Sequence, residues 1–166
     1  MDFDLVYKKY YSELYSFAMK QNQVNTEAAD VLQDAFTAYY KQLKTGNPIE
    51  NPRAWLYKVL LNSIRSEYKI SKYRQQKNIE IASFMQLSTD SGHDYHSTER
   101  RRIVEACITQ LTDDERNLLL LYHKGFSYKE ISEILKIGYT SVGTNIARAT
   151  KKLKSILITQ YHELFE

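Results

Sequence analysis

The sequence predicts an all-α fold of two small helical bundles joined by a flexible linker. Only two prolines and five glycines occur in 166 residues, so few positions interrupt helices. Hydrophobic residues make up 43% of the chain and recur at the three- and four-residue spacing of amphipathic helices. Near the middle, residues 88–97 are polar and short-chained, with no apolar period. We therefore expect one core on each side of this stretch.

Three helices are expected before the break. The first covers residues 3–22 and carries a broad aromatic face. The second begins at a cap near Asn25 and ends before Pro48. The third opens at Pro52, because a proline in the first turn of a helix loses no hydrogen bond through its missing N–H. Helices of this length can bury one core, and we expect it to define a domain over residues 1–74.

Residues 75–99 are predicted to be the flexible linker, since they contain too few periodic apolar side chains for a core. His93 and His96 lie in this stretch without any supporting cysteine pattern, which favours a solvated linker over a metal site. We expect no metal and no cofactor. The second domain should cover residues 100–166, with a capping-box helix start at Thr112–Glu115.

Within the second domain, residues 128–153 predict a helix-turn-helix. Two amphipathic helices are separated by a short break that contains Gly138. The second helix ends in a basic run, and no acid occurs between residues 136 and 158. On this segment alone, a basic surface helix of an ordinary bundle remains the alternative. The apolar positions are Ile131, Ile134 and Leu135 in the first helix and Val142, Ile146, Ala149 and Leu153 in the second.

Composition narrows the class of protein. No run approaches the roughly 18 apolar residues of a membrane span, and the start lacks signal-peptide features, so we expect a cytoplasmic protein without a membrane contact. Cys107 is the only cysteine, which excludes an internal disulfide and indicates a small core residue. The net charge is only +3, but residues 51–79 carry seven cations against Glu67 alone. Local positive charge of this kind is typical of polyanion binding.

Three segments, in this order, resemble those of bacterial RNA polymerase sigma factors of the two-domain extracytoplasmic-function (ECF) type. They are AADVLQDAF at 28–36, NPRAWLYKVLLN at 51–62, and the stretch 111–153 that holds the helix-turn-helix. The resemblance covers nearly the whole chain. It implies a non-enzymatic protein that binds core RNA polymerase, recognises and melts promoter DNA, and directs initiation. The implied polymerase contacts are the clamp coiled coil and the flap of the large subunits.

The first segment resembles the helix that docks on the polymerase clamp. Asp30, Gln33 and Asp34 are spaced so that they share one helical face. Two carboxylates and an amide would suit an arginine-rich partner. An ordinary solvated acidic face is the alternative, and only the rest of the pattern argues against it.

The second segment resembles the helix that receives the melted minus-ten element. Holding an unpaired strand requires cations near the backbone and flat rings for the bases. Trp55 is expected to be mainly structural, and Glu67 is expected to interrupt the basic face. The candidate strand contacts are Arg53, Lys58, Asn62, Arg65, Lys69 and Lys72.

The helix-turn-helix resembles the sigma domain that reads the minus-thirty-five element as duplex DNA. Its leading residues are small and include Gly143, and Arg148 is the only long side chain before the lysine run that suits a bidentate guanine contact. We therefore expect weak, salt-sensitive duplex recognition; close approach to thymine methyl groups is the alternative. The candidate duplex contacts are Ser141, Thr144, Asn145, Arg148, Lys151 and Lys152.

Two other classes of function fit the sequence less well. A stand-alone helix-turn-helix regulator that does not bind polymerase would explain the second domain but would leave the first two segments without a role. A helical enzyme is disfavoured because no nucleophile, metal cluster or phosphate loop occurs. Many members of the family are held by an anti-sigma factor, so the resemblance also implies an anti-sigma factor or another recruiting factor as a partner.

Overall fold

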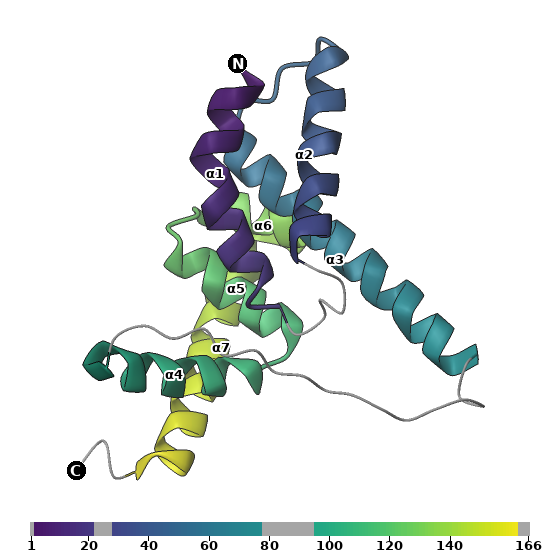
Figure 1. The fold of residues 1–166 in the computed structure, drawn as a ribbon. Helices are drawn as coiled ribbons and strands as arrows, with labels where there is room; N and C mark the ends of the chain where they lie inside the picture. Colours follow the sequence, from purple (N-terminus) through teal and green to yellow (C-terminus); the bar gives the residue numbers. More distant parts are fainter. Residues whose placement is uncertain (1, 22–27, 78–94, 163–166) are drawn as a thin grey trace. The chain divides into compact units, whose positions relative to one another are not determined.

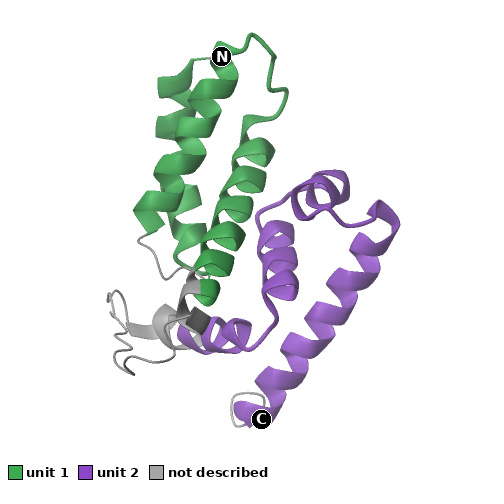
Figure 2. Ribbon diagram, turned by 90° about the vertical axis from the view of Figure 1, so that its right-hand side faces the viewer, with its two compact units in different colours: residues 1–81 green, residues 82–166 purple. Residues whose placement is uncertain are grey.

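The computed structural model describes residues 2–21, 28–77 and 95–162. These ranges hold seven α-helices and no strand, which confirms the all-α prediction (Figure 1). The chain divides into two compact units, Met1–Ile81 and Ala82–Glu166 (Figure 2). Each unit has its own core.

Unit 1 contains α1 (Phe3–Ala18), α2 (Ala28–Lys44) and α3 (Pro52–Lys77), and α2 packs against both other helices. Pro52 starts α3 as predicted, and the Asn51 side chain caps it by accepting a hydrogen bond from the Ala54 N–H at 3.1 Å. The predicted cap of α2 near Asn25 lies outside the described residues.

Aromatic rings join the three helices of unit 1. Trp55 of α3 meets the buried Tyr39 of α2 edge to face, with ring centroids 5.7 Å apart. Phe17 of α1 meets Tyr57 of α3 in the same way at 4.8 Å. Such pairs add to the area that the rings bury. The structural role predicted for Trp55 is therefore confirmed.

Unit 2 contains α4 (Tyr95–Thr109), α5 (Asp113–His123), α6 (Tyr128–Leu135) and α7 (Tyr139–Gln160). The long α7 packs against α4, α5 and α6. Cys107 is fully buried, as predicted, and burial raises the pKa of its thiol. The apolar core consists of Ile103, Cys107, Leu111, Leu118, Leu120, Leu121, Phe126, Ile131, Ile134, Leu135, Val142, Ile146 and Ala149.

The helices extend into both ends of the predicted linker, residues 75–99. Helix α3 continues to Lys77, and α4 already begins at Tyr95. Apolar periodicity marks only the turns of a helix that pack against a core, so a helix can begin before these turns and end after them. Residues 78–94, which include His93, lie outside the described residues.

The described part of the chain shows neither a metal site nor a membrane-spanning helix. It contains no group of three potential ligands that could hold a metal ion. Among its helices, none has the length and apolar character needed to cross a membrane.

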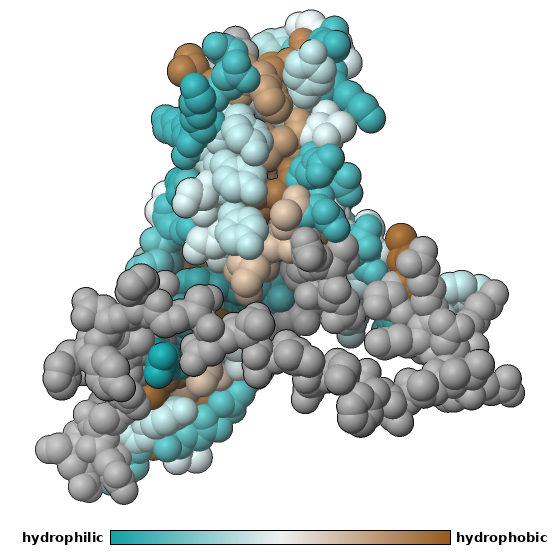
Figure 3. Space-filling model, viewed as in Figure 1, coloured by the Kyte–Doolittle hydropathy of each residue, from teal (hydrophilic) through white to brown (hydrophobic). Residues whose placement is uncertain are grey.

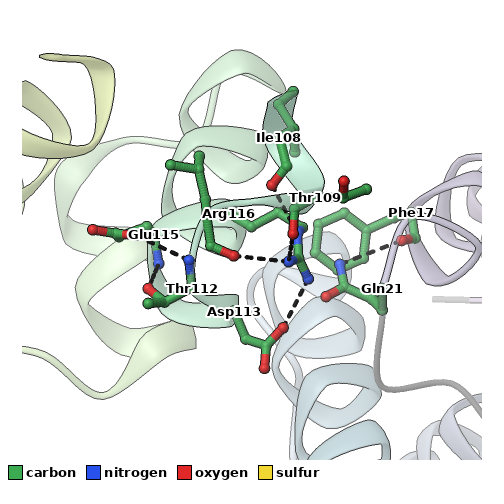
Figure 4. A network of polar contacts seen from close by, with 9 residues as sticks. Phe17, Gln21, Ile108, Thr109, Thr112, Asp113, Glu115 and Arg116 are labelled. Carbon is green, nitrogen blue, oxygen red and sulfur yellow. Dashed lines mark hydrogen bonds and ion pairs between the residues drawn. The ribbon is translucent and has the colours of Figure 1, made fainter. Parts of the chain in front are cut away.

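Among the described residues of unit 2, Arg116 of α5 is the most deeply buried charged side chain, at 1% exposure. Its guanidinium group donates hydrogen bonds to the carbonyl oxygens of Ile108, Thr109 and Leu111 at 3.3, 3.2 and 2.9 Å (Figure 4). It also pairs with Asp113 at 2.7 Å. The last carbonyls of a helix have no partner within that helix, so Arg116 satisfies the end of α4 and fixes the connection to α5.

Capping boxes start α5 and α6. Thr112 and Glu115 exchange side chain and backbone hydrogen bonds at the start of α5, which confirms that prediction. Ser127 and Glu130 form the same arrangement at the start of α6. The two boxes fix where α5 and α6 begin, and α6 is the first helix of the predicted helix-turn-helix.

The turn between α6 and α7 is held by Lys136 and Ser132. Lys136 ends α6 in the left-handed conformation, with φ of 58°, which a glycine would adopt without strain. The Ser132 hydroxyl donates to the Ile137 carbonyl at 2.7 Å. Gly138 then precedes α7 with an extended backbone. The predicted helix-turn-helix is therefore present, with lysine rather than glycine at its left-handed position.

Gly143 lies where α7 approaches α6. A Cβ atom at this position would come within 3.3 Å of Cε2 of Tyr128. The glycine therefore makes room for the Tyr128 ring, a role that the sequence analysis missed.

Replacing Arg116 with methionine should lower the free energy of unfolding by about 2–4 kcal/mol, because three carbonyls and Asp113 lose their shared partner. Chemical denaturation followed by circular dichroism measures this. Arg148→Met is the matched control, since Arg148 is an exposed arginine of the same unit and should change stability by about 0.5 kcal/mol or less. Equal midpoints for the two variants would contradict the structural role of Arg116.

Alanine should have opposite effects at two glycines of unit 2. Gly143→Ala should raise the free energy of unfolding by about 0.5–1 kcal/mol, because helix propensity improves. The Tyr128 ring, 40% exposed, has room to move. Gly125→Ala should lower it by about 1 kcal/mol, because Gly125 has φ of 79°. The same denaturation assay tests both, and destabilisation by Gly143→Ala would mean that Tyr128 cannot yield.

Candidate functional site

Helix α2 separates its polar and apolar residues onto two faces. Asp30, Gln33 and Asp34 are all exposed. Val31 and Phe36, among others of the same helix, are buried in the core of unit 1. The three predicted polar residues therefore lie together on the solvent face. Asp30 is in the first turn of α2, where the helix dipole favours a carboxylate.

An aromatic hollow of about 500 Å³ lies beside this face, between α1 and α2. Figure 3 shows it as a brown and white band between more polar margins. Gln33 belongs both to the hollow and to the polar face of α2. The aromatic face of the first helix is evident in the sequence, but the sequence alone gives this face no function. The lining residues are Phe3, Tyr7, Tyr11, Ala29, Gln33, Phe36, Thr37 and Tyr40.

Helix α3 carries the predicted strand contacts, and most of them share one face. Because each residue turns an α-helix by about 100°, Lys58, Asn62, Arg65, Lys69 and Lys72 fall on one side. Lys69 and Lys72 are exposed, and the other three are half-buried. They form what we call the α3 stripe, together with two tyrosines described below.

Glu67 does not lie on the α3 stripe. It is two residues from Arg65, which places it about 200° around the helix. Its side chain is half-buried, whereas Lys69 is exposed. The expectation that Glu67 interrupts the basic face is therefore wrong. Glu67 stands between the cations in the sequence, but it lies on another face of the helix.

Arg53 differs from the other predicted strand residues. Its guanidinium group forms a part-buried ion pair with Glu13 of α1, at 2.5 Å. Glu13 also accepts a hydrogen bond from the Tyr57 hydroxyl at 3.0 Å. Burial, together with Glu13, raises the pKa of Tyr57, which keeps the phenol protonated. Arg53 therefore links α3 to α1.

Two residues of the α3 stripe escaped the sequence analysis. Tyr68 and Tyr73 are 37% and 59% exposed. Tyr68 is three residues after Arg65, and Tyr73 is four residues after Lys69, so the rings lie among the cations of the stripe. This spacing of rings relative to cations is the sequence signal that identifies them.

Helix α7 has one buried and one exposed side. Ser141, Asn145, Arg148 and Lys152 follow one another at about one-turn intervals along one side, with Thr144 and Lys151 beside them. The core residues Val142, Ile146 and Ala149 occupy another side, while Leu153 is only half-buried. The predicted duplex contacts therefore share one surface.

Lys152 differs from its neighbours because it is paired within unit 2. Its ammonium group lies 2.7 Å from Oε2 of Glu115. The same oxygen accepts the Thr112 N–H in the α5 capping box. The hydrogen bond from Lys152 lowers the pKa of Glu115, and the Thr112 hydrogen bonds act in the same direction. Lys152 therefore joins α7 to α5.

Known proteins match this arrangement in both halves. The Sigma-70 region 2 family matches residues 6–77, and the Sigma-70 region 4 family matches residues 101–153. The chain is 26% identical to the ECF RNA polymerase sigma factor SigM of Bacillus subtilis, over 94% of this chain and 95% of SigM. It is also 26% identical to the RNA polymerase sigma factor YlaC of Bacillus subtilis, over 90% and 88% of the two chains.

Two solved structures share the fold. The sigma factor RpoE in its complex with the anti-sigma factor NepR from Bartonella quintana matches with a TM-score of 0.79 and 21% identity, over 96% of this chain and 98% of that one. CnrH, in complex with the cytosolic domain of CnrY, matches with a TM-score of 0.67 and 22% identity, over 95% and 88%. The two Sigma-70 regions match in order, one in each unit, and together they span more than half of the sequence; the chain belongs to the sigma-70 family and is an RNA polymerase sigma factor of the ECF type.

Proposed function

We propose that each of the three surfaces has a separate part in promoter-directed initiation. The polar face of α2 docks on the clamp coiled coil of core polymerase. The α3 stripe holds the melted minus-ten strand. The exposed side of α7 meets the minus-thirty-five duplex while unit 2 contacts the flap. The observation that carries this proposal is the segregation of charge in unit 1, with carboxylates on α2 and cations on α3.

The proposed division of the chain follows these roles. Residues 1–74 form the domain that docks on polymerase and melts DNA, and residues 100–166 form the domain that reads duplex DNA. Residues 75–99 form the connection between them. The chain performs no catalytic step, since nucleotide addition belongs to the polymerase, and it acts in the cytoplasm.

A protein partner on α2 is supported by the chemistry of its exposed face. Asp30 and Asp34 offer two carboxylates to arginine or lysine, and Gln33 offers an amide donor and acceptor between them. A polyanion such as DNA would be repelled by the two carboxylates. A stand-alone regulator would leave this face unused.

Duplex recognition by α7 combines a few base contacts with many phosphate contacts. Arg148 suits a bidentate pair with guanine and Asn145 one with adenine, whereas Ser141 and Thr144 reach only nearby atoms. Lys151 and Lys154 supply sequence-independent attraction to phosphates. Base selectivity therefore rests largely on Arg148 and Asn145.

Regulation by a protein partner is supported by the solved relatives. RpoE of Bartonella quintana is bound to the anti-sigma factor NepR, and CnrH to the cytosolic domain of CnrY. We infer that an anti-sigma factor or another recruiting factor also engages this chain.

Reversing both charges of the α2 face, in Asp30→Lys/Asp34→Lys, should weaken binding to core polymerase about tenfold or more, because attraction to a cationic partner becomes repulsion. Fluorescence anisotropy of labelled protein titrated with core polymerase measures it. The matched control is Glu50→Lys/Glu133→Lys, which changes the net charge equally at two other exposed acids. Unchanged affinity of the α2 variant, with normal folding by circular dichroism, would refute the docking surface.

The two neighbouring lysines of α7 should differ in their salt dependence. Binding of the full chain to mixed-sequence duplex DNA is measured as log K against log salt concentration. Lys151→Ala should reduce the slope by about 1, the value for one lost phosphate contact, while Lys152→Ala should reduce it clearly less. The reason is that Lys152 must first leave Glu115.

The Glu115→Gln background provides the internal control. There Lys152 has lost its anionic partner, so Lys152→Ala should now reduce the slope by about 1. Equal slopes for the two single lysine variants in the native background would show that the Glu115 pair does not withhold Lys152 from DNA.

A further inference from the structure

The hydroxyl group of Ser141 is already engaged within the first turn of α7. It donates a hydrogen bond to the carbonyl oxygen of Gly138 at 2.8 Å. The backbone N–H of Ser141 donates to the same oxygen at 3.0 Å. Serine side chains commonly bond to the backbone three or four residues before them in this way. Ser141 therefore uses both of its donors on one carbonyl group.

Gly138 leaves the space that this hydrogen bond needs. A Cβ atom at this position would lie 3.1 Å from Oγ of Ser141, which is closer than side chains normally approach. The backbone of Gly138 has φ of −62° and ψ of 133°, a conformation that any residue can adopt. The turn itself therefore does not require a glycine. What the missing side chain provides is room for the Ser141 hydroxyl to reach back to the carbonyl.

The engaged proton changes what Ser141 can offer to DNA. A serine hydroxyl has one proton and two lone pairs, so it can normally contact either donors or acceptors on a base edge. In Ser141 the proton is used, whereas no donor among the described residues contacts the hydroxyl oxygen. Donating elsewhere would break the bond to Gly138 for a new bond of similar strength. Toward DNA, Ser141 therefore acts as an acceptor.

Most groups on the surface of a DNA duplex do not match such an acceptor. Phosphate oxygens carry only lone pairs, so a contact with the Ser141 oxygen would place two acceptors against each other. Guanine N7 and O6, adenine N7 and thymine O4 are excluded for the same reason. The donors that the major groove presents are the exocyclic amino groups, N6 of adenine and N4 of cytosine.

We propose that Ser141 selects bases in the minus-thirty-five duplex by accepting a hydrogen bond from the exocyclic amino group of an adenine or a cytosine, with Gly138 as its positioning residue. This role rests on the proposed function of the exposed side of α7, which is to meet that duplex. It adds a contact of opposite polarity to the guanine contact of Arg148, because an arginine side chain only donates.

The test uses holoenzyme assembled from core polymerase and the full chain, with a promoter that this holoenzyme transcribes. The minus-thirty-five region is randomised, and the DNA bound by the wild type and by Ser141→Ala is sequenced. One position should lose its base preference in Ser141→Ala. The matched control is Thr150→Ala, which should leave every preference unchanged. Thr150 is exposed and lies nine residues after Ser141, on the opposite side of α7.

Every base pair carries one amino group in the major groove, so altered bases must identify the contacted atom. At the position found, purine replaces adenine, or 2-pyrimidinone replaces cytosine, which removes only the amino group. The loss of affinity in the wild type divided by the loss in Ser141→Ala is the coupling between Ser141 and the amino group. It should be about 3- to 10-fold, as expected for one neutral hydrogen bond.

Two further measurements test the polarity of the contact and the role of Gly138. A 7-deazapurine at the same base pair removes the N7 acceptor, and it should weaken binding equally for the wild type and Ser141→Ala. In Gly138→Ala, the coupling to the amino group should fall toward onefold, because the added Cβ displaces the hydroxyl.

Three outcomes would overturn the acceptor role of Ser141. They are a selected motif in which no position depends on Ser141, an equal loss for both proteins when the amino group is removed, and coupling to N7 in place of the amino group. Full coupling in Gly138→Ala would overturn the positioning role of Gly138. Failure of the proposed function is distinguishable from all of these. If the wild-type holoenzyme selects no sequence in the minus-thirty-five region, the role of α7 in meeting that duplex fails, and the role of Ser141 with it.

Discussion

Each core of this protein is enclosed by only three or four helices, so each helix can bury only one side. That constraint fixes what the other side presents. In α2, burial of Val31, Leu32, Ala35 and Phe36 turns Asp30 and Asp34 to solvent. A shift of one residue would rotate the helix by about 100° and carry a carboxylate toward the core. Hydrophobic burial therefore orients the polar surfaces that define function.

Short-range patterns explain how much of the structure the sequence predicts. Periodicity predicts the helices and their faces, and the Thr112–Glu115 capping box is visible because its partners are three residues apart. Contacts between distant residues are not visible in this way. Arg53 pairs with Glu13 across 40 residues, and Lys152 with Glu115 across 37. Nothing near either residue indicates its partner.

The burial of Arg116 is likewise not predictable from its neighbours in the sequence. An arginine that follows three acids at the start of a helix is expected to be exposed, since charged side chains are rarely buried unless they are paired. It is buried because the carbonyls at the end of α4 converge on it, and their convergence depends on how α4 and α5 meet. Counting cations along the chain therefore overstates the charge that is available to DNA: Arg53, Arg116 and Lys152 all have acidic partners within the chain.

One oxygen of Glu115 connects the start of α5 with Lys152 of α7, which is distant in sequence. It accepts the N–H that caps α5 and also holds the ammonium group of Lys152 on α7. A phosphate that draws Lys152 away would change the charge balance at the first turn of α5. Thermodynamic linkage is reciprocal, so whatever stabilises that turn with Lys152 in place must oppose the phosphate by the same free energy. The helix start and the nucleic-acid surface of unit 2 are thus coupled through one carboxylate, without any change of fold.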